Sequence, residues 1–546
     1  MGNFVSRTKL VIGGAYILNK LLNSLSKRIK ESPGLPVPNP TLSFWTVPKS
    51  KISSNGKAIP ETADIVVIGS GITGTSFSYN ALKLDGSLKI VILEARDVCS
   101  GATGRNGGHV NPPLYQDYKY LKETHGIDVA KKTIRFRLAH IKEFLTIAGL
   151  EEITEHSQCR EVDNLDVYFT EDEYAEVKDA LELWKTDMPE EAQSWEAVDG
   201  DVASKQFGLS SEIAGCVHGD GGAMHPYRFV TSLQSKLLER HSGFSIATHT
   251  PCTEIYPPSS SSSLYTLITP SGRITTPHIV HATNAWSSHL LTPMREKIIP
   301  VRGTMTAQRP GASLSTHTLD GLRSYVFNSG GAGYDYLTQL PTGEHELMFG
   351  GGALSNLTSG LEADLGSADD SQYSISTAAH ITGSLPLMFG LDNWGKEMVP
   401  NLEPEADLGV QWSEGRVKSV WSGILGMSAD GYPWVGRLPR KISGRPEPTA
   451  SSTSASLPLL RHKTRPSTSS YEKLSDRQRT ATPGEWIAAG YTGEGMVQAW
   501  MSAKALAYMV LDRESDIVGW FPENLRVTEE RWKKADVVDL IIRRMT

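Results

Sequence analysis

Runs of hydrophobic residues near the start of the chain predict a strand, a helix and a second strand in close succession. Residues 65–68 are all apolar and β-branched, as expected for a strand buried on both faces, and residues 88–93 predict another strand. Residues 72–83 lie between them, contain no proline and suit a helix. We interpret these segments as one structural unit.

Farther along the chain, the hydrophobic pattern changes between helical and strand-like spacing. Residues 164–170 alternate as a strand does, and residues 279–291 predict a strand followed by a helix. Residues 300–352 alternate and are rich in glycine and aromatics, which is typical of antiparallel strands, with a hairpin at 332–352. Helical spacing covers 128–150, 171–185 and, after an initial turn, 221–241.

Three glycines follow the first predicted strand with the spacing G-x-G-x-x-G. Gly69 permits the tight turn, Gly71 lets a pyrophosphate approach the backbone, and Gly74 lets the helix pack on the strand. Glu94 ends the second strand, where an acid can accept hydrogen bonds from both ribose hydroxyls of an adenosine. The glycines alone could mark only tight packing, but the complete order favours binding of a dinucleotide, either NAD or FAD.

Length, charge and cysteine usage restrict the class of protein. A chain of 546 residues is long enough for two domains, and a net charge of −7 gives no indication of a nucleic-acid partner. The cysteines are scattered without metal-ligand spacing, which predicts no metal site and a reducing, intracellular compartment. They are Cys99, Cys159, Cys216 and Cys252.

The N-terminal segment, residues 1–30, is basic and has no acidic residue. Its apolar stretch 10–18 is too short to span a bilayer and favours an interfacial segment, and MGNFVS fits a myristoylation pattern. A peripheral membrane contact, a mitochondrial presequence and a disordered tail of a cytoplasmic protein stay open. The proline-rich stretch 31–42 is interpreted as a linker, with folded structure starting near residues 44–45.

Two further glycine-rich segments distinguish between the cofactors. Residues 100–110 contain Arg105 and Asn106 and can wrap a cofactor that extends past the pyrophosphate, whereas an NAD-dependent dehydrogenase would continue with regular strand–helix alternation. Residues 488–496 supply a glycine turn that opens a helix, whose N-terminus would stabilise negative charge on a reduced flavin. These segments favour FAD.

At these motifs the chain resembles the D-amino-acid-oxidase-like (DAO) family of FAD-dependent oxidoreductases, which includes glycine and sarcosine oxidases and γ-glutamylputrescine oxidoreductases. The resemblance covers residues 60–515 apart from an insertion. Its blocks are VVIGSGITGTS, ILEARDVCSGATGRNGG, HATNAWSSHL, PVRGTM, DYLTQLPTGEHELMFGGG, WSGILGMSADGYPWVG and AAGYTGEGM. It implies a mixed α/β (α+β) fold, in which a Rossmann-type FAD-binding domain is interleaved with a substrate domain built on a mixed, antiparallel sheet.

The resemblance also implies a domain organisation in which the chain crosses several times between the two domains. The FAD-binding domain is expected at 44–155, 221–299, 413–440 and 484–515, and the substrate domain at 156–220 and 300–412. The remaining parts are the N-terminal segment with its linker (1–43), a C-terminal extension (516–546) and an insertion (441–483). The insertion is rich in Ser, Thr, Pro, Arg and Lys and is predicted to be disordered.

Site residues are carried over from the family by position. His109, Tyr336 and Arg302 are the candidate catalytic residues. For His109 and Tyr336 the alternative is a packing role, and for Arg302 it is an ion pair. WSGILGMSAD has no cysteine, so the flavin is expected to be non-covalent. The residues expected to hold FAD are Gly69, Gly71, Ile72, Thr73, Gly74, Glu94, Ala95, Arg96, Ser100, Ala102, Arg105, Asn106, Gly107, Thr283, Gly493, Gly495 and Met496.

The reaction implied by the resemblance is oxidation of a C–N bond in an amine or amino acid. A hydride would pass to flavin N5, and the resulting imine would be hydrolysed. The substrate would be a small molecule, with O2 or an unidentified compound as electron acceptor. The alternatives are a non-catalytic or assembly-type flavoprotein of the same fold and an NAD-dependent dehydrogenase.

Overall fold

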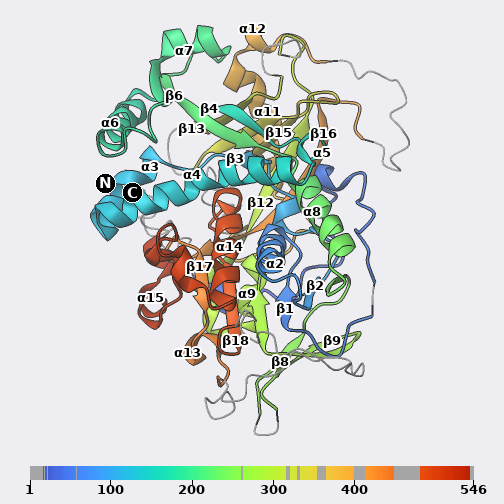
Figure 1. Ribbon diagram of the computed structural model, residues 1–546. Coiled ribbons are helices and arrows are strands. Elements are labelled where there is room, and N and C mark those ends of the chain that lie inside the picture. The colour runs from blue at the N-terminus through green and yellow to red at the C-terminus, as the bar shows by residue number, and fades with distance from the viewer. Residues whose placement is uncertain are drawn as a thin grey trace.

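The structure is a computed structural model that places two large sheets in the lower and upper halves of the molecule (Figure 1). It describes residues 16, 19–20, 23–56, 58–259, 262–314, 320–328, 333–352, 364–398, 412–447 and 480–540. Most of the expected disordered insertion, residues 448–479, lies outside the described residues, as do residues 1–15 of the basic N-terminal segment.

The lower sheet contains the strand–helix–strand unit predicted from the sequence. In the described part of the chain, its six strands are in the order β17 (Trp434–Arg437), β18 (Gly484–Ala489), β11 (His278–His281), β1 (Ile65–Ile68), β2 (Ile90–Leu93) and β7 (Phe244–Ala247). Neighbouring strands are parallel except for β17 and β18. α2 (Ile72–Leu84) packs beside α14 (Ala499–Val510) in front of this sheet (Figure 1). The sheet therefore has the parallel, helix-covered form expected of a nucleotide-binding domain.

The upper sheet is mixed and largely antiparallel, as expected. Its main path among the described residues is β16 (Val417–Ser428), β12 (Ile298–Gln308), β15 (Leu347–Gly351), β14 (Asp335–Gln339), β13 (Arg323–Asn328), β4 (Arg160–Tyr168), β6 (Gly215–Ala223) and β3 (His109–Val110), and β5 (Glu196–Asp199) also pairs with β6. β13 and β4 are parallel, and the other pairs are antiparallel. The predicted hairpin is confirmed as β14 and β15.

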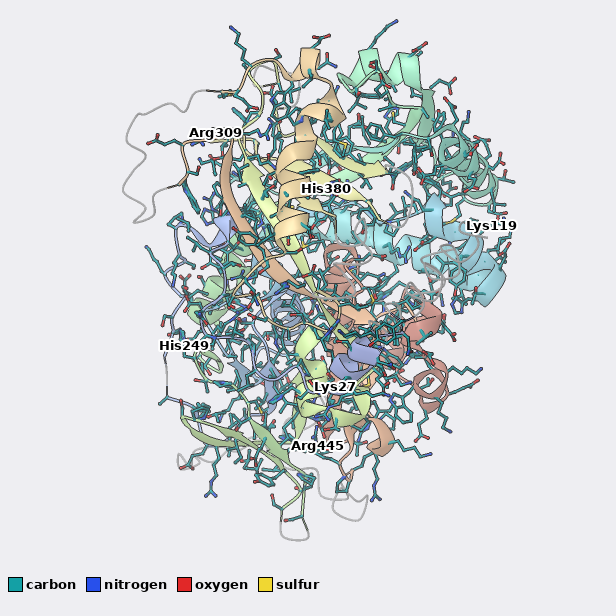
Figure 2. The ribbon with its side chains drawn as sticks, turned by 180° about the vertical axis from the view of Figure 1, so that it is seen from behind. Lys27, Lys119, His249, Arg309, His380 and Arg445 are labelled. Carbon is teal, nitrogen blue, oxygen red and sulfur yellow. The ribbon has the colours of Figure 1, made fainter. Side chains whose placement is uncertain are left out.

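The two faces of the upper sheet have different surroundings. Leu165 and Val167 of β4 belong to a buried cluster with Tyr325, Phe349 and residues of α11 (Ile375–Phe389). Figure 2, from behind, shows α11, which carries the labelled His380, lying across this face. Because side chains alternate along a strand, Asn164, Asp166 and Tyr168 of β4 lie on the opposite face.

The remaining helices surround the sheets, and the predicted helices at 128–150 and 171–185 are confirmed. The remaining α-helices of the described residues are α3 (Tyr115–His125), α4 (Ile127–Leu150), α5 (Thr154–Ser157), α6 (Glu171–Asp187), α7 (Gly200–Phe207), α8 (Pro226–Arg240), α9 (Ser287–Leu290), α12 (Leu391–Trp394), α13 (Arg440–Ser443) and α15 (Glu529–Lys534). A small sheet contains β8 (Glu254–Tyr256), β9 (Tyr265–Thr269) and β10 (Gly272–Thr276). No helix in the described ranges has the length and apolar character needed to cross a membrane.

The segment before α8 differs from the sequence prediction. A turn was expected at residue 221, but Gly221 and Gly222 form the end of β6 and pair with Val162 and Glu161. A Cβ atom on Gly221 would lie 2.3 Å from Asn111 Oδ1. The glycines there permit close approach of neighbouring chain rather than a turn.

The proline-rich stretch interpreted as a linker also differs from expectation, because it is held against the body of the protein. Thr41 N donates to Asp370 O at 2.7 Å, and Ser43 is fully buried. Leu25 and Ile29, which precede this stretch, are buried in a cluster with Leu291 and Trp434. Packed structure therefore begins well before residues 44–45.

Candidate functional site

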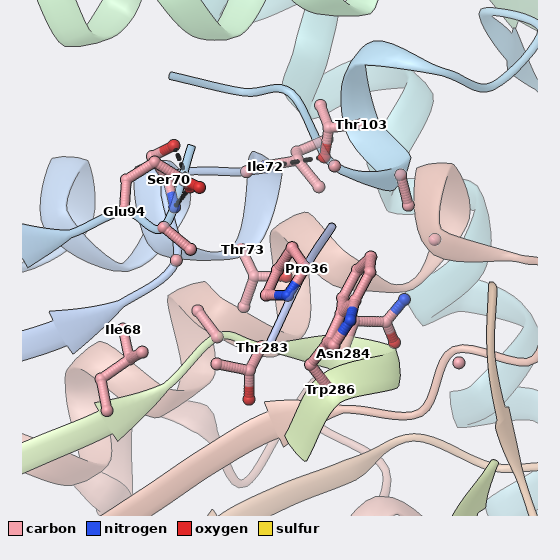
Figure 3. A pocket seen from close by; sticks show the side chains of 18 of the residues that line it. Pro36, Ile68, Ser70, Ile72, Thr73, Glu94, Thr103, Thr283, Asn284 and Trp286 are labelled. Atoms are coloured by element: carbon pink, nitrogen blue, oxygen red, sulfur yellow. Dashed lines mark hydrogen bonds between the residues drawn. The ribbon is translucent and has the colours of Figure 1, made fainter. Parts of the chain in front are cut away.

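The first cavity lies at the carboxyl ends of β1 and β2, where a dinucleotide is expected in this type of sheet. Its volume is about 170 Å³, and its wall includes the first turn of α2 and the loop after β11. Figure 3 shows Ile72, Thr73 and Thr283 around it.

The glycine motif keeps side chains away from this turn. Gly69 has φ +109°, and a Cβ atom there would lie 2.6 Å from Ala282 O. A Cβ on Gly74 would lie 2.1 Å from Gly69 O, so the third glycine permits the helix to approach the turn. Ile72 N donates to Thr103 Oγ1 at 3.0 Å, which ties the helix start to the second glycine-rich loop (Figure 3). The cradle is therefore built from backbone and short side chains.

Glu94 stands at the end of β2, on the wall of the first cavity. One carboxylate oxygen accepts from Ser70 N at 3.0 Å and Ser70 Oγ at 2.6 Å, as Figure 3 shows, and the other accepts from Arg96 N at 2.9 Å. Since a carboxylate offers about four acceptor positions, these bonds orient Glu94 and leave capacity for a hydroxyl group.

Residues 32–46, here called the strap, cross the first cavity. Gly34, Leu35 and Pro36 line it, and Figure 3 shows Pro36 among the other lining residues. Arg96 Nη1 donates to Val37 O at 3.2 Å, and Arg105 Nη2 donates to Thr41 O at 2.8 Å. Two further hydrogen bonds hold the strap: Ser43 Oγ donates to Gly104 O at 2.7 Å, and Trp45 Nε1 donates to Asn106 O.

The second cavity, of about 600 Å³, adjoins the first beneath the upper sheet. The two cavities share the lining residues Ala102, Asn106, Leu425, Gly493 and Met496. A molecule extended through the first cavity would therefore present its far end to the second.

His109 and Tyr336 line the second cavity with their ring centroids 5.7 Å apart. His109 Nδ1 lies 2.6 Å from Ser324 Oγ, and burial lowers the pKa of His109 to about 3. Tyr336 donates its hydroxyl to Met305 Sδ at 3.0 Å, and burial raises the pKa of this tyrosine. Both side chains are therefore neutral near pH 7.

Arg302 forms an ion pair, which was the alternative to a catalytic role for this residue. Its Nε donates to Asp364 Oδ1 at 2.8 Å, and it is 7% exposed. Among the described residues, those that line the two cavities include Asp364 and the neighbours of Arg302 but not Arg302 itself. The Arg302 guanidinium thus offsets the negative charge of Asp364 on the wall of the second cavity.

The C-terminal glycine loop borders both cavities. Ideal Cβ atoms on Gly493 and Gly495 would meet no atom within 4 Å, so the backbone there faces open space. Glu494, between them, lies 3.6 Å from Arg137 Nη2 and accepts from Gln498 Nε2 at 2.9 Å. Its negative charge is therefore offset by a buried arginine.

Most of the residues expected to hold FAD line one of the cavities. Arg105 and Gly107 line the second cavity, whereas Gly74 and Ser100 line neither but support the loops around them. Those that line the first cavity are Gly69, Gly71, Ile72, Thr73, Glu94, Ala95, Arg96, Ala102, Asn106, Thr283, Gly493, Gly495 and Met496.

Sequence reasoning missed the strap and one wall of the second cavity. Asn164, Asp166 and Tyr168 of β4 line that cavity, together with Asn111 and Gln116. The available signal was the alternation of polar and apolar residues at 164–170, which predicted the strand but not what its polar face would contact.

The fold and the two adjoining cavities define a class of protein, in which a parallel sheet of the dinucleotide-binding type stands beside a mixed, largely antiparallel sheet. The family model described as "FAD dependent oxidoreductase" (DAO) matches residues 64–509. The chain therefore belongs to the DAO family of FAD-dependent oxidoreductases.

Individual relatives agree with this assignment. The chain is 22% identical over 302 residues to γ-glutamylputrescine oxidoreductase of Escherichia coli K12, a match that covers 54% of this chain and 65% of that protein. Its fold is similar to that of glycine oxidase from Geobacillus kaustophilus (TM-score 0.57, 15% identity, 86% of this chain and 99% of that one). It is also similar to L-proline dehydrogenase from P. horikoshii (TM-score 0.58, 16% identity, 88% and 100%).

Proposed function

We propose that the protein uses FAD to oxidise the C–N bond of a small amine or amino acid. One observation carries the proposal. The first cavity, whose wall contains the glycine motif, adjoins a larger cavity lined by side chains of the upper sheet. The similarity of the fold to those of glycine oxidase and L-proline dehydrogenase supports this substrate class.

The residues present fit FAD. The N-terminal turn of α2 would hold the pyrophosphate, and Glu94 would bind the adenosine ribose. Gly493 and Gly495 leave space for a ring at the junction of the cavities, since no atom lies within 4 Å of where a Cβ would be. The strap would then cover the nucleotide.

When bound, FAD would supply an acceptor for a hydride from the carbon that bears a neutral amine, and water would hydrolyse the resulting imine to a carbonyl compound and ammonia or an amine. His109, with a pKa of about 3, is too weak a base to remove a proton at neutral pH, so we assign it an orienting role. Tyr336 contributes a neutral, half-buried wall that would exclude water from the reacting carbon.

We further propose that FAD is bound without a covalent link. In the part of the chain that the structure describes, the second cavity has no cysteine on its wall. Cys252 lines the first cavity, but burial raises its pKa to about 12, so little nucleophilic thiolate is present. Acid precipitation of the purified protein is expected to release all flavin into the supernatant. Flavin that stays with the pellet would contradict this.

The proposed function is tested by anaerobic titration of the purified holoprotein with primary amines, secondary amines and amino acids. The expected result is bleaching of the flavin absorbance by at least one of them, and readmitted air tests whether O2 is the acceptor. Bound FAD that no amine reduces would favour a non-catalytic flavoprotein. Co-purified nicotinamide nucleotide in place of FAD would favour a dehydrogenase of the NAD class.

A further inference from the structure

Asp166 is a buried carboxylate on the wall of the second cavity. Its Oδ2 accepts from Tyr115 Oη at 2.7 Å and Gln116 Nε2 at 2.8 Å, and its Oδ1 accepts from Asn164 Nδ2 at 3.1 Å. All of these donors are neutral. Within the described ranges, no lysine, arginine or histidine forms an ion pair with it.

The other charged side chains of this cavity have partners of opposite charge. Asp117 and Glu494 share Arg137, at 2.8 Å from its Nη1 and 3.6 Å from its Nη2, and Asp364 accepts from Arg302 Nε at 2.8 Å. Arg105, the cation on the cavity wall, lies 3.5 Å from Asp370. Asp166 therefore leaves negative charge at one end of the cavity.

This charge lies away from the junction with the first cavity. β4 is two strands from β14, which carries Tyr336, so Asp166 and Tyr336 are separated by about 10 Å at the usual spacing of strands. The residues shared with the first cavity do not include Asp166. A small molecule could thus reach from the flavin end to this carboxylate.

Burial of a carboxylate without a counter-ion is unfavourable, and a cation supplied by a ligand would offset it. Burial raises the pKa of Asp166 to about 6, so the group is still mostly ionised at pH 7 and above. A ligand carboxylate at the same place would instead be repelled.

We infer that the second cavity takes a substrate with two amine groups, one on the carbon that is oxidised and a second, protonated one that pairs with Asp166. This inference rests on the proposed function. It distinguishes the substrate from a simple monoamine and from an amino acid whose carboxylate would occupy the far end of the cavity.

The test compares three compounds of equal length in anaerobic reduction of the holoenzyme: 1,6-diaminohexane, hexylamine and 6-aminohexanoate. The diamine is expected to reduce the flavin with a second-order rate constant (limiting reduction rate divided by Kd) about 10–100-fold above those of the other two, mainly through a lower Kd. Diamines from 1,3-diaminopropane to 1,8-diaminooctane then give the preferred length. Equal rates for diamine and monoamine would overturn the inference and leave the proposed function intact.

Two variants on the same strand separate binding from structure. Asp166→Asn is expected to lower the second-order rate constant of flavin reduction by the diamine about 10–100-fold more than that by hexylamine. Asp163→Asn is the matched control, because Asp163 contacts His218 and does not line the cavity. Equal losses with both substrates in Asp166→Asn would show a structural role only.

A binding measurement keeps the inference independent of turnover. Calorimetric titration with 1,6-diaminohexane is expected to show binding to the wild-type protein and to Asp163→Asn, and at least tenfold weaker binding to Asp166→Asn. If no amine reduces the flavin, the proposed function fails, and this titration still decides whether Asp166 pairs with the ammonium group of a diamine. Binding that is equal in all three proteins, or undetectable in the wild type, would overturn it.

Discussion

At the scale of the residue, the second glycine of the motif controls entry of the cofactor. Gly71 lines the first cavity, and a Cβ atom there would lie 3.0 Å from Thr103 Oγ1. Gly71→Val is expected to give a folded but colourless protein, because the branched side chain would occupy the position of the pyrophosphate. Flavin absorbance per mole of purified protein measures this.

The matched control for that substitution is Gly519→Val, at an exposed glycine whose Cβ would meet nothing within 4 Å. This variant is expected to retain the wild-type flavin content. A yellow Gly71→Val protein would show that the nucleotide does not lie across this turn.

The buried Asp166 carboxyl group is also expected to affect the stability of the folded protein. Burial raises its pKa from 3.8 to about 6, so between these values the folded state binds more protons than the unfolded state. The free energy of unfolding therefore falls as pH rises through this range, by about 2–3 kcal/mol, and stays low above it. The Asp166→Asn variant has no carboxyl group to ionise at this position, so its free energy of unfolding does not fall in this way.

The ligand-free Asp166→Asn variant is accordingly expected to unfold at a higher temperature than the wild type at pH 7.5, with a smaller difference near pH 4. Thermal unfolding of both proteins followed by tryptophan fluorescence measures the difference. A variant that is less stable than the wild type at pH 7.5 would indicate that the hydrogen bonds of the carboxylate outweigh its desolvation.

At the scale of the element, the strap is expected to slow release of FAD. Pro36 and its neighbours cover the first cavity, and Arg96 and Arg105 hold the strap in place. Deleting residues 1–40 is expected to accelerate FAD dissociation at least tenfold, whereas deleting residues 1–22 leaves in place the strap and the buried Leu25 and Ile29 that precede it. The rise of flavin fluorescence after dilution measures release.

Equal release rates for the two truncations would show that the strap does not retain the cofactor. A faster rate in both would assign the effect to residues 1–22 instead.

Elements with strong periodicity could be predicted from the sequence, and those fixed by distant contacts could not. α4, with apolar residues on one face, ends at Leu150 as expected. The strap was interpreted as a linker because its prolines give no periodic signal, although distant Arg96, Arg105 and Asp370 bind its backbone. The same limit applies to Arg302, whose partner Asp364 lies 62 residues away.

At the scale of the whole molecule, one buried cluster connects the two halves. A single buried cluster includes Ile65 and Val67 of the lower sheet together with Val217, Met305 and Met348 of the upper sheet. Unfolding is therefore expected to occur in one cooperative transition, and FAD at one hundred times its Kd is expected to stabilise the folded state by about 2.7 kcal/mol.

Coincident melting curves from tryptophan fluorescence and calorimetry, both shifted upward by FAD, would support this prediction. Two separate transitions, of which FAD shifts only one, would show that the halves unfold independently.

The alternation along β4 has a consequence for how this protein could diverge. Leu165 and Val167 attach the strand to the cluster around α11, whereas Asn164, Asp166 and Tyr168, which alternate with them, line the second cavity. Replacing every other residue would therefore change which compounds are accepted while the scaffold is retained. Selection could act on chemistry and on foldability through separate sets of positions in a single short stretch of backbone.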